Sequence, residues 1–160
     1  MHIRSYATSD LEQVLDLTIA TFGPFYENYV RPLLGEQVFC HQHGQWKQDY
    51  REMVPTLHDP AQGRHLALAH LDGALAGYVA WKVEADRRHG ALEILAVAAA
   101  CRRQHVARDL CEHAFQAMRS AGVEVVEVGT GGDAFHTPAR GLYESLGFTK
   151  IPIAGYLMAP

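Results

Sequence analysis

Residues 91–110 read ALEILAVAAACRRQHVARDL, and the rest of the chain is best understood outward from this stretch. Residues 91–98 are almost all apolar and predict a buried strand. From Val106 onward apolar residues recur at helical spacing, so a helix is expected to follow. Arg102 and Arg103 stand where that helix would begin, although the helix dipole is already positive there. A strand that leads into a helix offers free backbone N–H groups to an anion, which predicts a phosphate site; two solvated arginines are the alternative.

The flanking segments predict an antiparallel meander followed by alternating helix and strand. Asp72-Gly73 is typical of a hairpin turn, and Gly23-Pro24 is expected to end the first helix. The expected strands cover residues 2–7, 64–71, 74–85, 91–98, 123–128, 148–151 and 154–158, and the expected helices begin near residues 10, 106 and 138. The predicted fold class is α/β, or α+β, with a mixed but mainly antiparallel central sheet flanked by helices.

Residues 24–60 differ from the rest, because large aromatic side chains alternate there with histidines and carboxylates. Proline and glycine interrupt the helical periodicity, so two short helices and loops are expected. The segment either packs over the sheet or forms a wall for an acceptor substrate. In the second case, carboxylates would bind ammonium groups and rings would pack on sugars or aliphatic carbons. The candidate substrate-binding residues are Tyr26, Trp46, Asp49 and Glu52 from this segment, and Asp133 from a later glycine-rich loop.

A chain of 160 residues and 17.7 kDa is expected to form a single domain, residues 1–160. Its hydrophobic fraction of 48% excludes a disordered chain. The longest nearly apolar run, residues 94–101, is far shorter than the roughly 20 residues of a membrane span. The N-terminus has no apolar stretch of signal-peptide length, so a cytoplasmic protein without a membrane partner is expected. An excess of 18 acidic over 14 basic residues argues against a nucleic-acid partner.

Cysteine and histidine spacing gives no reason to expect a metal. The three cysteines are widely spaced and form no CxxC pair, which argues against structural zinc and against a disulfide framework. His41 and His43 have the spacing of some metal sites, but no cysteine or carboxylate cluster completes such a site.

Leu95-Ala96-Val97, followed by residues 102–110, resembles the pyrophosphate motif Q/R-x-x-G-x-G/A of the GNAT superfamily, which are acyl-CoA-dependent N-acetyltransferases. Arg102 fills the first position of the motif and Ala107 the last. His105 stands where the family usually has glycine, which lets the backbone approach the phosphates closely. A histidine inside the helix, with negative φ, could still donate its own N–H. The expected consequence is a reshaped phosphate cradle or a second donor to it.

A second stretch, residues 136–148, resembles the C-terminal motif N-x-x-A-x-x-L-Y-x-x-x-G-F of the same family. The match from Ala139 to Phe148 is close, whereas His136 occupies the usual Asn position. The resemblance spans residues 64–158, with the first strand and helix also fitting. Residues 128–133 ahead of this motif are also similar to small aminoglycoside N-acetyltransferases of the kasugamycin type.

The resemblance implies transfer of an acetyl group from acetyl-CoA, a cosubstrate, to a primary amine without a metal. Tyr143 matches the general acid that protonates the leaving thiolate. Glu93 lies on the expected active-cleft strand, on one face with Leu95 and Val97, and is the candidate base or water-orienting group. Glu127, Asp133, His136, the aromatic segment and a water chain are alternatives. The candidate cofactor-binding residues are Leu95, Val97, Arg102, Arg103, Gln104, His105, Val106, Ala107, Arg108, Asp109 and His136.

Three functions remain open from the sequence. The preferred one is acetylation of a small polar cationic molecule, with an aminoglycoside antibiotic as a candidate and antibiotic resistance as the consequence. Acetylation of a protein N-terminus or lysine is the second. A non-catalytic CoA-binding module is the third, motivated by His105 and His136 in place of the family's usual residues. A homodimer is left open.

Overall fold

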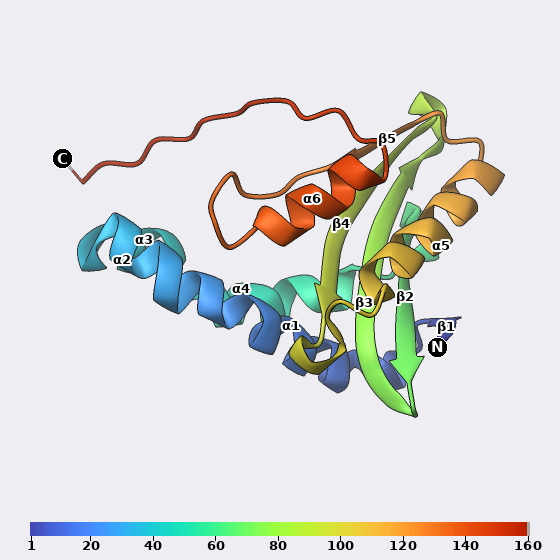
Figure 1. Ribbon diagram of the computed structural model, residues 1–160, viewed down its shortest axis with the longest axis horizontal. Coiled ribbons are helices and arrows are strands. Elements are labelled where there is room, and N and C mark those ends of the chain that lie inside the picture. The colour runs from blue at the N-terminus through green and yellow to red at the C-terminus, as the bar shows by residue number, and fades with distance from the viewer. Residues whose placement is uncertain (160) are drawn as a thin grey trace.

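The computed structural model describes residues 1–159 and has one five-stranded sheet at its centre (Figure 1). The strands lie in chain order, and each pairs antiparallel with the next except for the last two, which are parallel. The strands are β1 (His2–Ser5), β2 (Arg64–Leu71), β3 (Ala74–Glu84), β4 (His89–Val97) and β5 (Val125–Val128). Asp72 and Gly73 both have positive φ between β2 and β3, which confirms the predicted hairpin turn.

Helices cover both faces of the sheet (Figure 1). They are α1 (Leu11–Phe25), α2 (Arg31–Leu34), α3 (Glu36–His43), α4 (Trp46–Met53), α5 (Val106–Ser120) and α6 (Thr137–Ser145). Neighbouring strand residues alternate between two buried clusters: Tyr78 and Ile94 pack with α1, whereas Val79 and Leu92 pack with α5. The predicted fold class, a mixed and mainly antiparallel sheet flanked by helices, is confirmed.

An ion pair whose carboxylate is buried and whose guanidinium is partly exposed joins β1 to the start of α1. Both guanidinium NH groups of Arg4 donate to the carboxylate of Asp10 at 2.7 Å, and the backbone N–H of Ala7 donates to it at 2.8 Å. Asp10 is 3% exposed. The hydrogen bonds from Arg4, which outweigh the effect of burial, lower the pKa of Asp10 to about 2.

We expect Asp10→Asn to lower the free energy of unfolding at pH 7 by about 2 kcal/mol, because a depressed carboxyl pKa contributes stability above its ordinary value. The wild-type contribution is lost as the pH falls from about 4 through about 2, so the two proteins should converge in acid. Urea unfolding at both pH values measures the difference. Asp16→Asn, on the exposed side of α1, is the control and should change little. A difference in the free energy of unfolding between the two proteins that stays constant with pH would contradict the lowered pKa of Asp10.

Gly23-Pro24 does not end the first helix, contrary to the sequence prediction. α1 continues to Phe25 and passes through a π-helical turn, Tyr26–Val30, into α2. Pro24 cannot donate a helical hydrogen bond, but packing against α4 compensates for this loss. The ring of Tyr26 stacks on Trp46 with 4.9 Å between centroids. A Cβ on Gly23 would lie 3.2 Å from the Trp46 ring, so glycine allows this close packing. Residues 24–60 are largely helical, with α2, α3 and α4 instead of the two helices expected.

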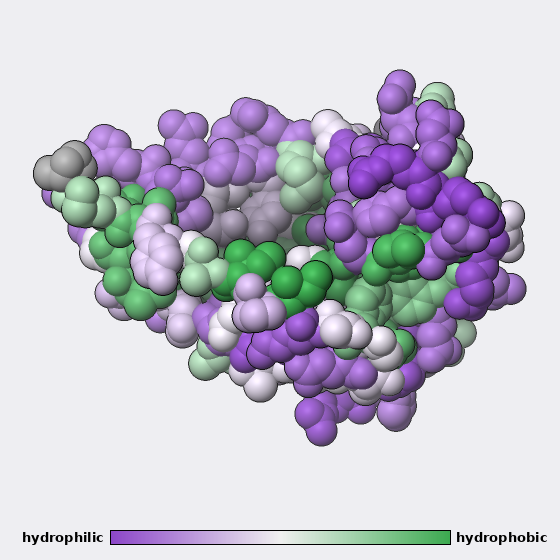
Figure 2. Space-filling view, turned by 90° about the horizontal axis from the view of Figure 1, so that it is seen from above, coloured by the Kyte–Doolittle hydropathy of each residue, from purple (hydrophilic) through white to green (hydrophobic). Residues whose placement is uncertain are grey.

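The two final strands, expected over residues 148–151 and 154–158, are not formed. Phe148 packs against Phe115, but the chain beyond it finds no partner strand among the described residues, and Pro152 removes one ladder donor. Its apolar side chains therefore remain in solvent, with Ile153 90% and Tyr156 92% exposed. Apolar atoms gather at the end of the molecule where this segment lies (Figure 2).

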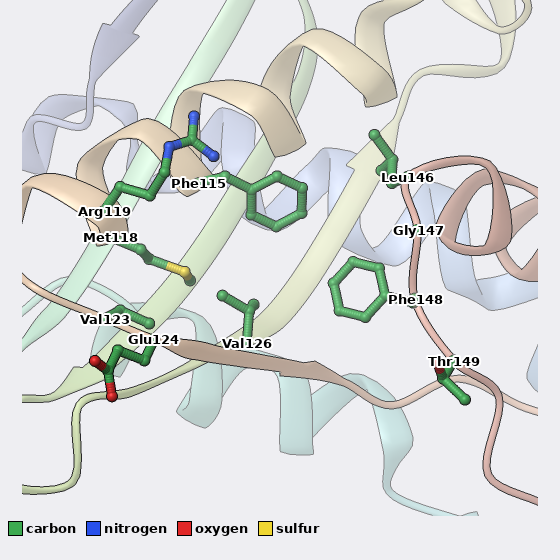
Figure 3. Close-up of a pocket in the computed structure, with 10 residues that line it drawn as sticks. All are labelled: Phe115, Met118, Arg119, Val123, Glu124, Val126, Leu146, Gly147, Phe148 and Thr149. Carbon is green, nitrogen blue, oxygen red and sulfur yellow. The ribbon is translucent and has the colours of Figure 1, made fainter.

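A cavity of about 350 Å³ lies where α5, β5 and the segment after α6 meet (Figure 3). The side chains of Phe115, Met118, Val126 and Phe148 converge on it. None of the candidate catalytic, cofactor-binding or substrate-binding residues lines it. The cavity is thus a separate feature from the candidate site.

Candidate functional site

The sheet opens between its two parallel strands. β4 and β5 pair only from His89 with Val125 to Leu92 with Val128, although β4 continues to Val97. Beyond Leu92, β4 is paired with β3 alone, so its backbone groups on the β5 side have no strand partner. Such unpaired N–H and C=O groups can bind the amide groups of an extended ligand.

A β-bulge at Glu93 determines which way its side chain points. Ala80 pairs with Ile94 and Trp81 with Leu92, which leaves Glu93 without a partner on β3. The extra residue shifts the alternation of side chains. Glu93 consequently lies on the α1 side with Ile94, while Leu95 and Val97 pack on the α5 side. The expectation that Glu93 shares a face with Leu95 and Val97 was wrong, because the bulge was not foreseen.

The Glu93 carboxylate is held by Arg64, at the start of β2. An NH group of Arg64 donates to Glu93 Oε1 at 2.6 Å, and its other NH group donates to the carbonyl of Thr56 at 3.0 Å. The Glu93 side chain is 19% exposed. One oxygen of the carboxylate is therefore occupied, while Oε2 has no hydrogen bond from residues 1–159. Arg64 was not foreseen from the sequence, since its partner is distant in the chain.

The loop between β4 and α5 has the geometry of an anion-binding site. Arg103 and His105 have φ values of 63° and 62°, in the left-handed region. Within residues 1–159, none of the backbone N–H groups of residues 103–108 has an acceptor. Alternating left-handed residues before a helix N-terminus make a concave set of donors that suits phosphate oxygens. Arg102 and Arg103 are exposed at its rim.

His105 is the residue before α5 and not part of the helix, so the expected helical conformation with negative φ was wrong. Its left-handed backbone is one that glycine adopts without strain, which accounts for the family's preference there. We expect His105→Gly to raise the free energy of unfolding by about 0.5–1 kcal/mol, the relief of backbone strain less the added chain entropy. Chemical denaturation measures this. The control is Gln104→Gly, at a residue without positive φ, which should not raise the free energy of unfolding. A His105→Gly protein less stable than the wild type would contradict backbone strain at residue 105.

Tyr143 lies on the inner face of α6, in the cluster that α5 shares with the sheet. It is 8% exposed, and its ring meets Phe148 edge-on at 5.9 Å. Burial raises the pKa of Tyr143 to about 12. The phenol therefore keeps its proton at neutral pH and is available as a hydrogen-bond or proton donor.

His136 and Asp133 form a pair at the start of α6. His136 Nδ1 lies 2.7 Å from Asp133 Oδ2, and the His136 backbone N–H donates to Oδ1 at 3.1 Å. Burial opposes ionisation of Asp133, but the hydrogen bonds from His136 outweigh it and lower the pKa of that carboxyl. Arg140 fixes the loop by donating to the carbonyls of Gly131 and Asp133, each at 2.6 Å. Sequence reasoning placed both paired residues at the site but in separate roles.

The four candidate substrate residues of segment 24–60 fall into two groups. Tyr26 and Trp46 stack together, and Trp46 is 4% exposed, with its indole N–H donating to Glu27. Asp49 and Glu52 lie on the exposed side of α4. The aromatic pair thus forms an interior support, and the two carboxylates are open to solvent.

Residues 1–159 contain no group of three histidines, cysteines or carboxylates that could hold a metal ion. None of the helices described has the length and apolar character needed to cross a membrane.

Comparisons with known proteins agree with this geometry. The model of the acetyltransferase (GNAT) family matches residues 24–148. YsnE of Bacillus subtilis, described as an uncharacterized N-acetyltransferase, is 39% identical over 83 residues, which are 51% of this chain and 54% of that protein. The match to this curated relative thus spans about half its length.

Two solved structures share the fold. A protein of Desulfovibrio desulfuricans assigned to the GNAT family superposes with a TM-score of 0.70 at 21% identity, covering 94% of this chain and 86% of that one. An aminoglycoside 6′-N-acetyltransferase of Acinetobacter haemolyticus gives 0.65 at 18% identity, covering 100% and 99%. The chain belongs to the GNAT family of acetyltransferases, which use acetyl-CoA as acyl donor.

Proposed function

We propose that this protein transfers the acetyl group of acetyl-CoA to a primary amine of a small, polar, cationic molecule. The observation that carries the proposal is the run of unpaired backbone N–H groups over residues 103–108, beside the opening of β4 and β5. These donors suit a diphosphate, and the free edge of β4 suits the amide groups of a pantetheine arm. Family membership supports the same cosubstrate.

In this proposal the diphosphate is bound by the backbone N–H groups of residues 103–108 together with the side chains of Arg102 and Arg103, whereas the N–H of Asp109 already donates to the His105 carbonyl. The backbone of β4 near Val97 would donate to the thioester carbonyl, where negative charge develops during attack. Tyr143 would donate its phenolic proton toward the leaving sulfur. Glu93 would lie on the acceptor side and either take the amine proton or orient the water that does.

The acceptor is proposed to be cationic because the candidate catalytic and substrate-binding residues include four carboxylates. Asp49 and Glu52 are exposed on α4, Glu93 has one oxygen free, and Asp133 lies in the loop before α6. The Acinetobacter protein named above is an aminoglycoside acetyltransferase. An aminoglycoside is therefore the first acceptor to test, and its acetylation would give antibiotic resistance. A protein N-terminus or lysine is the second candidate. A cytoplasmic location and a homodimer, both left open by the structure, belong to the same proposal.

Two measurements test the proposal. Titration with CoA should release heat and raise the melting temperature, and thiol release should appear with acetyl-CoA and a panel of amines weighted toward aminoglycosides. Absence of both heat and thermal shift would refute CoA binding. CoA binding without turnover on any amine, peptides included, would instead favour a non-catalytic CoA-binding module.

A further inference from the structure

The Asp133–His136 pair leaves one ring nitrogen of the histidine available. Nδ1 is engaged by Asp133, which cannot donate when ionised, so Nδ1 carries the proton and the lone pair of the neutral ring resides on Nε2. Within residues 1–159, Nε2 has no hydrogen-bond partner, and no side-chain nitrogen or oxygen that is fully buried lacks one. Nε2 is therefore accessible from outside the protein. A base oriented by a carboxylate, with its free nitrogen exposed, is the arrangement needed to accept a proton.

Gly131 is the residue that makes room for this pair. A Cβ at Gly131 would overlap Asp133 Oδ2 and the His136 ring, whereas a Cβ at the neighbouring Gly132 would meet nothing within 4 Å. The loop therefore fits closely around the pair at one glycine only. Together with the Arg140 bonds to the loop carbonyls, this fit holds the imidazole in one orientation.

His136 is the residue that directly precedes α6, and Tyr143 lies within that helix. Seven residues separate them, which is about 10 Å along the helix axis. Helical side chains lean toward the N-terminus, so the Tyr143 hydroxyl leans toward His136. Tyr143 packs in one cluster with Leu95 and Val97 of β4, whereas the His136 ring packs against Phe25 and Phe135. His136 therefore lies at the N-terminal end of the helix whose Tyr143 packs against β4.

The His136 ring also touches the helical segment that would carry the acceptor. It packs edge-on against Phe25, at the end of α1, with 4.6 Å between ring centroids. The pair thus lies where Phe25, near the start of the 24–60 segment, meets the loop before α6. The charged groups that face it are Asp133 on the loop and Arg140 on α6, while α1 presents the uncharged ring of Phe25.

We infer that His136, oriented by Asp133, is the group that accepts the proton of the acceptor ammonium, in place of Glu93, the candidate base named above. The inference rests on the proposed transferase function. The ammonium gives one proton to Nε2, and its freed lone pair forms the C–N bond at the thioester carbonyl carbon. The C–S bond then breaks, and its electron pair leaves on sulfur. The nitrogen loses its second proton to water as the amide forms, the thiolate takes the phenolic proton of Tyr143, Tyr143 regains a proton from water, and His136 releases its own to solvent.

The decisive variants keep the shape of the loop and remove the proton acceptor. His136→Asn restores the residue usual in the family at this position and cannot take up a proton. Asp133→Asn can still accept the backbone N–H of His136, but its amide group would donate to Nδ1 and move the ring proton to Nε2. Steady-state rates with acetyl-CoA and an amine that the wild type acetylates are measured across pH, with CoA affinity measured in parallel.

We expect both variants to lower kcat/KM at least 30-fold at neutral pH and to abolish its decline toward acid, with CoA affinity retained within threefold. Glu93→Gln should keep the acidic decline, and Gly131→Ala should lower the rate far more than Gly132→Ala. An acidic decline that survives His136→Asn, or disappears with Glu93→Gln, would overturn the inference. Turnover by the wild type separates this outcome from failure of the proposed function, in which no amine is acetylated.

Discussion

Replacement of Tyr143 by phenylalanine is expected to lower kcat about 100-fold while CoA affinity stays within a few fold. The substitution removes only the hydroxyl, and loss of a positioned proton donor typically costs a factor of this size. The ring, which packs with Phe148, is unchanged, so the free energy of unfolding should shift by less than about 1 kcal/mol.

The pH dependence adds a second criterion. Because the pKa of Tyr143 is raised to about 12, the phenol is protonated throughout the assay range. Tyr143→Phe should therefore scale the whole pH–rate profile downward without changing its shape. Tyr156→Phe, in the exposed C-terminal segment, is the control. Near-normal turnover, or loss of one limb of the profile, would remove Tyr143 from the role of acid.

A carboxylate at residue 105 is expected to weaken CoA binding on the order of 100-fold. His105→Asp would place a negative charge beside the free N–H groups of residues 103–108, where it competes with and repels a diphosphate. His105→Asn has nearly the same shape and tolerates the same left-handed backbone, so it should bind CoA as the wild type does. Calorimetric titration of both variants isolates the effect of charge.

Salt provides the corresponding check on this second prediction. The difference between the Asp and Asn variants should shrink as ionic strength rises, because exposed charges are screened. Equal affinity of the two variants at low salt would mean that the diphosphate does not bind at this loop.

Much of the fold follows from local sequence patterns. The strand patterns of residues 64–71 and 74–85, joined by the Asp72-Gly73 turn, predict β2 and β3, and apolar spacing predicts α5. The helix end predicted at Gly23-Pro24 was wrong because the free-energy cost of a proline in a helix can be read locally, whereas the compensating packing of Tyr26 on Trp46 depends on a distant helix. The prediction of strands over residues 148–151 and 154–158 was wrong because a strand needs a partner strand, and the residue pattern alone does not show whether one is present.

The candidate site was predicted in part. Within the stretch from Arg102 to Asp109, the backbone N–H groups of residues 103–108 are unpaired, as expected of a phosphate loop, and their role in binding stays a prediction. The orientation of Glu93 was not accessible, because one bulged residue reverses every side chain beyond it and leaves no mark in composition. The pairing of His136 with Asp133 was accessible in principle, since three residues separate them in a glycine-rich loop that can fold back on itself.

Among residues 1–159, β5 pairs with the remainder of the sheet through four residue pairs only. Backbone hydrogen bonds therefore hold β5 to β4 along this short length, whereas α6 is held to α5 and the sheet by side-chain packing. A ligand whose amide groups lie between β4 and β5 would supply hydrogen-bond partners to β4 beyond Leu92 and so hold the two strands together over a greater length. In the free protein, the amide hydrogens of β4 beyond Leu92 should then exchange with solvent faster than those of β2 and β3. Their exchange should slow markedly once this ligand is bound.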